Sequence, residues 1–172
     1  MKTFFWLFLI ALFPVALSSL VYLVGRTRRA DRIPYFAKQL IIGILFGGMA
    51  VLGTEFGVKI DGAVINARDA SPICAGLLFG APAGIIAGVI GGVERWFAVL
   101  WGAGEYTRLA CSVSTVLAGI FAASLRKHMF DNKKPKWFYC LAVAVITEVI
   151  HMLMIFLTNM TDARTAFSFV RA

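Results

Sequence analysis

The chain has 172 residues, of which 60% are hydrophobic and 15% are charged, and its formal net charge is +8. Soluble domains have about 45–50% apolar and about 25% charged residues, so this chain can hide its apolar surface only in a bilayer. Its length suits roughly six spans and leaves no room for a soluble catalytic domain. The basic residues lie in short runs beside apolar segments, which argues against nucleic-acid binding and makes anionic membrane lipid their expected partner.

The first apolar segment begins at Phe4 and stops at Arg26. Lys2 and the small residues Ser18 and Ser19 give it a likeness to a signal peptide, but the apolar run is too long for one. The sequence therefore predicts an uncleaved first transmembrane helix over residues 1–25.

Further apolar segments lie at about residues 39–56, 71–92, 98–123 and 137–158, and another begins at Thr165. The fold class that they predict is an all-α integral membrane protein, a polytopic helical bundle. We expect one multi-span domain over residues 39–172, with its last helix truncated and an output domain missing.

Two clusters of Lys and Arg set the expected orientation, because short basic loops face the cytoplasm. The N-terminus is then outside, and the chain crosses the membrane an even number of times between the clusters. The first cluster comprises Arg26, Arg28, Arg29, Arg32 and Lys38, and the second comprises Arg126, Lys127, Lys133, Lys134 and Lys136.

The apolar stretch at residues 71–92 contains Pro82. The even number of crossings favours a hairpin there, with a short helix from about Asp69 to Phe79, a turn at residues 80–82 and a second, rising helix. A single helix kinked at Pro82 is the alternative, because glycines spaced by four residues are typical of closely packed membrane helices. We expect these glycines to serve packing; they are Gly76, Gly80, Gly84, Gly88 and Gly92.

Under the hairpin topology, several polar side chains fall at the same outer level. Ionisable groups in a bilayer normally face a bundle interior or a cavity, and the planar guanidinium of Arg matches a carboxylate. The sequence predicts a small-anion site with the candidate ligand-binding residues Asn66, Arg68, Arg95, Arg108, Cys111 and Ser114.

Internal pairing is the alternative for the arginines. Arg68 could pair with Asp69 or Glu94, and Arg95 with Glu94 or Glu105. Arg108 could equally be a residue that extends to the membrane interface.

Glu148 and His151 lie one turn apart on the same helix face. A single E-x-x-H unit does not make a di-iron site, so we expect no metal. We favour a buried Glu–His pair over the floor of a ligand pocket.

We interpret Cys74 and Cys140 as small apolar residues that serve packing. The sequence has no CxxC pair, P-loop or nucleophile elbow, so we expect no cofactor and no catalytic site.

Four motifs then occur in order: Asn66-Ala-Arg-Asp69, Ala75-Gly-Leu-Leu-Phe-Gly-Ala-Pro-Ala-Gly84, Gly91-Gly-Val-Glu-Arg-Trp96 and Cys111-Ser-Val-Ser-Thr-Val-Leu-Ala-Gly119. From Gln39 onward the chain resembles the LytS/YhcK-type five-transmembrane receptor domain. The resemblance implies a sensor joined to a cytoplasmic histidine kinase or diguanylate cyclase (GGDEF). It also implies sensing of small solutes such as pyruvate-like carboxylates, with binding positions at Arg68, Arg95, Cys111 and Ser114.

The segment from Trp96 to Arg108 is similar to the diguanylate-cyclase branch of that family. The domain is also similar to the substrate-binding components of vitamin transporters, which are six-helix bundles with an outward pocket.

The leading expectation is therefore a signal-input receptor in the bacterial cytoplasmic membrane, which binds a small carboxylate from outside and controls an output domain. The alternatives are a substrate-binding subunit of a vitamin-type transporter and a ligand-free anchor. We expect a homodimer, and in the anchor alternative the small-residue steps Gly43–Gly47 and Gly84–Gly88 would serve as its face.

Overall fold

A computed structural model describes residues 2–25, 32–60, 63–102 and 104–159. Four of its helices are long and apolar enough to cross a membrane, at Tyr35–Glu55, Ala81–Trp101, Arg108–His128 and Trp137–Thr158, and two shorter apolar helices lie at Leu12–Gly25 and Ala70–Phe79. The predicted fold class, an all-α polytopic membrane bundle, is confirmed. The segment expected to begin at Thr165 lies outside the described residues.

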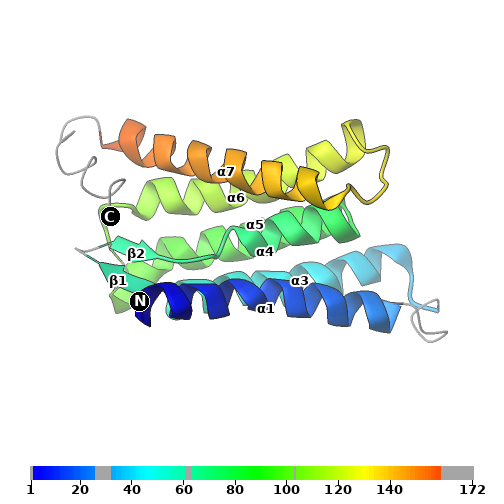
Figure 1. The fold of residues 1–172 in the computed structure, drawn as a ribbon, viewed down its shortest axis with the longest axis horizontal. Coiled ribbons are helices and arrows are strands. Elements are labelled where there is room, and N and C mark those ends of the chain that lie inside the picture. Colours follow the sequence, from blue (N-terminus) through cyan, green and yellow to red (C-terminus); the bar gives the residue numbers. More distant parts are fainter. Residues whose placement is uncertain (1, 26–31, 61–62, 103, 160–172) are drawn as a thin grey trace.

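The long helices lie side by side along one axis (Figure 1). Their bounds are α1 (Lys2–Gly25), α3 (Tyr35–Glu55), α5 (Ala81–Phe97), α6 (Arg108–His128) and α7 (Trp137–Thr158). The short pieces are α4 (Ala70–Cys74), the π-helix η1 (Ala75–Phe79) and the 3₁₀-helix η2 (Ala98–Trp101). Two three-residue strands, β1 (Val58–Ile60) and β2 (Ala63–Ile65), pair antiparallel between α3 and α4, which the sequence analysis did not predict.

The elements that flank the two basic clusters meet at the same end of the bundle; Arg26, Arg28 and Arg29 themselves lie outside the described residues. The end of α1 and the start of α3 lie there together with the end of α6 and the start of α7, whereas the β-hairpin lies at the opposite end (Figure 1). A side-chain contact agrees with this view, because Lys134 Nζ of the α6–α7 loop lies 4.1 Å from the centroid of the Tyr22 ring of α1. The chain therefore crosses an even number of times between the clusters, as the positions of the basic residues predicted.

The stretch around Pro82 is a hairpin, and the alternative of one kinked helix is wrong. The chain descends through α4 and η1, breaks at Gly80 with φ +153°, and returns through α5 with a proline in its first turn. A Cβ built on Gly84 would lie 2.5 Å from Gly76 Cα. In a continuous helix, which rises about 1.5 Å per residue, these two positions would be about 12 Å apart.

A glutamine of α3 closes the break between the two arms of the hairpin. The break leaves backbone groups without helical partners, and such groups need partners inside a membrane. Gln39 Nε2 donates to the Phe79 carbonyl at 3.1 Å, and Gln39 Oε1 accepts from the Ala83 amide at 3.2 Å. Gln39 is 4% exposed, so this polar turn is held within the protein.

The glycine spacing lets backbones touch where the hairpin meets α6. A Cβ on Gly88 would lie 3.0 Å from the Thr115 carbonyl oxygen, and one on Gly92 would lie 2.7 Å from the Ser112 carbonyl oxygen. A Cβ on Gly119 would overlap the Gly84 carbonyl oxygen. The glycines thus serve packing, as predicted, and they hold the polar face of α6 against the arginine-bearing end of α5.

We predict that Gly84→Ala lowers the thermal unfolding midpoint of the purified domain. The added methyl group would meet the Gly76 backbone, and such overpacking costs about 1–3 kcal/mol. Gly48→Ala is the matched control, because nothing lies within 4 Å of a Cβ at that exposed α3 position. Its midpoint should stay the same or rise, since Ala favours a helix over Gly. Equal midpoints for the two variants would contradict the packing described here.

Candidate ligand site

Arg68 and Arg95 are the two largest side chains that the bundle buries fully, each 1% exposed. Arg68 precedes α4, and Arg95 lies in the last turn of α5. Both reach one face of α6, where Thr107, Cys111 and Thr115 follow one another at helical spacing. Two permanent charges in the interior demand internal partners or a ligand.

Arg68 has a partner on each of its nitrogens. Nε donates to Thr115 Oγ1 at 2.8 Å, Nη1 to Thr54 Oγ1 at 3.3 Å and Nη2 to the Cys111 carbonyl at 3.4 Å. Nε also lies 3.5 Å from Asp69 Oδ1, which in turn accepts from the Thr115 hydroxyl at 2.6 Å. Of the two pairings considered for Arg68, the structure contains the one with Asp69. The hydrogen bonds of Arg68 to Thr54, Thr115 and the Cys111 carbonyl tie the start of the hairpin to α3 and α6.

Arg95 is bonded much less completely. Nη2 donates to the Gly104 carbonyl at 2.7 Å and to Thr107 Oγ1 at 3.1 Å. Nε and Nη1 are buried and have no hydrogen-bond partner among the described residues. The described part of the chain also places no carboxylate in ion-pair contact with Arg95, so its expected pairing with Glu94 or Glu105 does not form.

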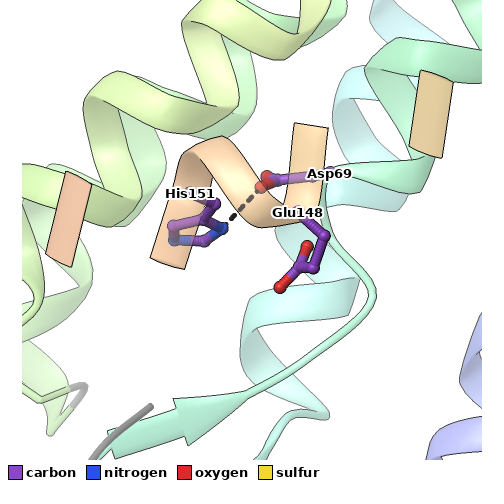
Figure 2. Close-up of side chains that lie close together, drawn as sticks. All are labelled: Asp69, Glu148 and His151. Atoms are coloured by element: carbon purple, nitrogen blue, oxygen red, sulfur yellow. Dashed lines mark ion pairs between the residues drawn. The ribbon is translucent and has the colours of Figure 1, made fainter. Parts of the chain in front are cut away.

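The side chains of Asp69, His151 and Cys111 form two consecutive contacts next to Arg68. His151 Nδ1 of α7 lies 2.9 Å from Asp69 Oδ2, and His151 Nε2 lies 3.3 Å from Cys111 Sγ of α6. All three side chains are buried. Figure 2 shows Asp69 reaching from the start of the hairpin to the imidazole on α7.

The expected Glu148–His151 pair is replaced by this arrangement. His151 faces Asp69, and Glu148, one turn before it, is exposed, with its carboxylate on the same side of α7 (Figure 2). Sequence reasoning could not find this contact, because Asp69 and His151 meet only through the packing of α7 on the hairpin.

Asp69, Glu148 and His151 are the described residues whose ligand atoms gather closely enough to consider a cation, all within 4.8 Å of one another. Zinc bonds of about 2.0–2.2 Å in a tetrahedron hold ligand atoms about 3.3 Å apart or more. The 2.9 Å between Asp69 Oδ2 and His151 Nδ1 is shorter than that. The geometry therefore favours an ion pair at this position.

The other predicted residues lie around this centre. Asn66 Oδ1 accepts from the Arg68 amide at 3.1 Å, which fixes the turn into α4. Ser114 is 2% exposed, and its hydroxyl has no hydrogen-bond partner among the described residues. Arg108 turns to the Trp96 ring, with Cζ 4.1 Å from its centroid. Two residues of the network that the sequence analysis did not name are Thr54 and Thr107, since a lone threonine near a helix end carries no distinctive pattern.

The two arginines should respond oppositely to the same substitution. Arg68→Met leaves Asp69 without its guanidinium, and breaking a buried pair costs about 3–5 kcal/mol. Arg95→Met removes a buried charge with two unpartnered donors, so the free energy of unfolding should stay within about 1 kcal/mol of the parent or increase. Thermal unfolding of both variants in detergent tests this, and equal losses of stability would refute the difference in bonding.

Comparison with known proteins adds three findings. A family model described as "5TMR of 5TMR-LYT" matches residues 21–172. Sensor histidine kinase YpdA of Escherichia coli (strain K12) is 27% identical over 126 residues, which are 73% of this chain and 21% of that protein. Sensor histidine kinase BtsS of the same strain is 28% identical over 128 residues, which are 72% of this chain and 21% of BtsS. No solved structure matches the chain significantly.

The chain thus spans about a fifth of the length of these curated relatives. Both are sensor histidine kinases, so the expected likeness to the diguanylate-cyclase branch gains no support from them. The family match covers most of the sequence and confirms the resemblance found in the motifs: the chain belongs to the 5TMR family of 5TMR-LYT membrane domains.

Proposed function

We propose that this domain is the signal-input part of a bacterial membrane sensor and that it binds a small carboxylate through Arg95. The observation that carries the proposal is the pair of buried donor nitrogens, Nε and Nη1, that have no hydrogen-bond partner on a guanidinium that forms no ion pair in the described chain. Arg is always charged and presents parallel donors that fit a carboxylate. The sensor histidine kinases among the relatives support a receptor over a transporter subunit or an anchor.

Ligand binding at Arg95 would change the contacts at the start of α6. The Gly104 carbonyl and the Thr107 hydroxyl occupy one nitrogen of Arg95. An incoming carboxylate is a stronger acceptor than a carbonyl, and it would displace Gly104 and move the loop at the start of α6. A ligand shifts a conformational equilibrium only by binding one state better than another, and this exchange of acceptors supplies such a difference.

The ligand should stabilise the domain measurably. In a thermal-shift screen against small carboxylates, phosphate, amino acids and vitamins, a ligand at 100 times its dissociation constant adds about 2.7 kcal/mol. We expect a shift with a carboxylate that is lost in Arg95→Met. Arg126→Met, at the opposite end of the bundle, is the control and should keep the shift. No shift with any solute would favour the anchor, and a shift that survives in Arg95→Met would place the ligand elsewhere.

The proposed orientation puts this site and the N-terminus outside the cell, with both basic clusters in the cytoplasm. It is tested in a chain whose three cysteines are replaced and that carries one new cysteine, at Glu105 or at Asp131. A membrane-impermeant maleimide should label the Glu105→Cys variant in intact cells and the Asp131→Cys variant only after lysis. The reverse pattern would invert the orientation and rule out an extracellular ligand.

A further inference from the structure

We infer that Cys111 is a reactive thiol that adds reversibly to the electrophilic carbon of the ligand, with His151 and Asp69 as its proton relay. The inference rests on the proposed function for the ligand's carboxylate. It adds a covalent step, which requires that the ligand carry an aldehyde or ketone carbonyl beside its carboxylate.

The proposed relay is inferred from two interatomic distances. A nucleophile is activated when it lies within hydrogen-bond reach of a base that a third group orients. Cys111 Sγ lies 3.3 Å from His151 Nε2, and Asp69 Oδ2 lies 2.9 Å from Nδ1 on the other side of the ring. The same order of groups, carboxylate to imidazole to nucleophile, serves acyl-transfer enzymes of unrelated folds.

The three relay residues come from three parts of the bundle. Asp69 is held by Arg68 and Thr115, whose own contacts reach α3 and α6. Cys111 lies one turn before Thr115 on α6, and His151 comes from α7. Such support by neighbouring hydrogen bonds is what gives a reactive side chain a defined position.

Two groups with unused donors lie close to Cys111 along α6. Arg95 Nη2 donates to Thr107, which lies one turn before Cys111, and Arg95 Nε and Nη1 have no hydrogen-bond partner in the described chain. Ser114 follows Cys111 by three residues on the same helix face, and its hydroxyl is equally unpartnered among the described residues. A carboxylate on Arg95 would bring the adjacent carbon of the ligand toward Sγ, and the Ser114 hydroxyl could donate to the carbonyl oxygen.

The step balances without an oxidant. The thiol proton passes to His151 Nε2, and the sulfur forms a bond to the carbonyl carbon. The π pair of the C=O bond moves to the oxygen, which takes the proton back from His151. The product is a thiohemiacetal from an aldehyde or a thiohemiketal from a ketone. No group leaves, so the reverse step releases the ligand intact, as a sensor requires.

The other cysteines provide an internal reference. Cys140 is half-buried against the apolar cluster that contains Ile73, Leu77 and Val143. It lies outside the group of relay residues, so it reports the reactivity of an ordinary thiol in the same protein.

The test uses two alkylating agents of similar size, anionic iodoacetate and neutral iodoacetamide, on the whole purified domain in the presence of a chelator. Mass spectrometry of peptides measures the alkylation rate of each cysteine. We expect Cys111 to react at least tenfold faster than Cys140 in the folded chain, and faster with iodoacetate than with iodoacetamide. In the detergent-denatured chain the two cysteines should react alike.

Variants separate the two parts of the site. Arg95→Met should remove the preference for iodoacetate over iodoacetamide, measured as the ratio of the two rates, whereas His151→Asn should slow both reagents without changing that ratio. If His151→Asn does not fold, the ratio of the Cys111 rate to the Cys140 rate in the unaltered chain still decides whether Cys111 is a reactive thiol.

The reactive thiol and the proposed function would be overturned by different experimental outcomes. A Cys111 that reacts no faster than Cys140, in a domain that carboxylates still stabilise, overturns the reactive thiol and leaves the proposed function standing. A fast Cys111 that reacts equally with both reagents, in a domain that no carboxylate stabilises, overturns the carboxylate ligand and with it the proposed function.

Discussion

The burial of the Arg68 guanidinium is the interaction on which the arrangement of the polar end depends. A permanent charge in a bundle of apolar helices is stable only if neighbouring groups replace water. Here the replacement comes from Thr54 of α3, from Thr115 and the Cys111 carbonyl of α6, and from Asp69 beside it in sequence. Because Asp69 is held in this way, its second oxygen faces α7, and His151 is drawn toward the bundle axis.

Arg95 shows the opposite solution to the same problem. It is as deeply buried as Arg68, yet only its Nη2 has partners among the described residues, and both are in the loop that opens α6. One arginine therefore has a partner on every nitrogen, and the other keeps two donor nitrogens without a partner among the described residues. This contrast, which burial alone does not reveal, is the reason why the proposed ligand site is assigned to Arg95.

The sequence predicted the parts of this structure that follow from hydropathy and from the distribution of charge. The spans, the return of the chain near Pro82 and the gathering of Arg68, Arg95 and Cys111 at one end all followed from the bilayer thickness and from the even number of crossings. The contacts that depend on how each helix is rotated about its own axis could not be predicted from the sequence. The choice of Asp69 over Glu148 by His151, and the closure of the hairpin turn by Gln39, are set by side-chain packing that no local pattern encodes.

The close approach of glycine backbones limits which helices can move. Since Gly84 meets Gly76 and Gly119 backbone to backbone, the hairpin and α6 can neither separate without losing that fit nor rotate without a clash. They form one stiff unit. By contrast α7 is a peripheral helix, most of whose residues are not buried inside the protein. It is therefore less restrained than the hairpin and α6, although it carries His151 at the site and begins beside the basic loop at the other end.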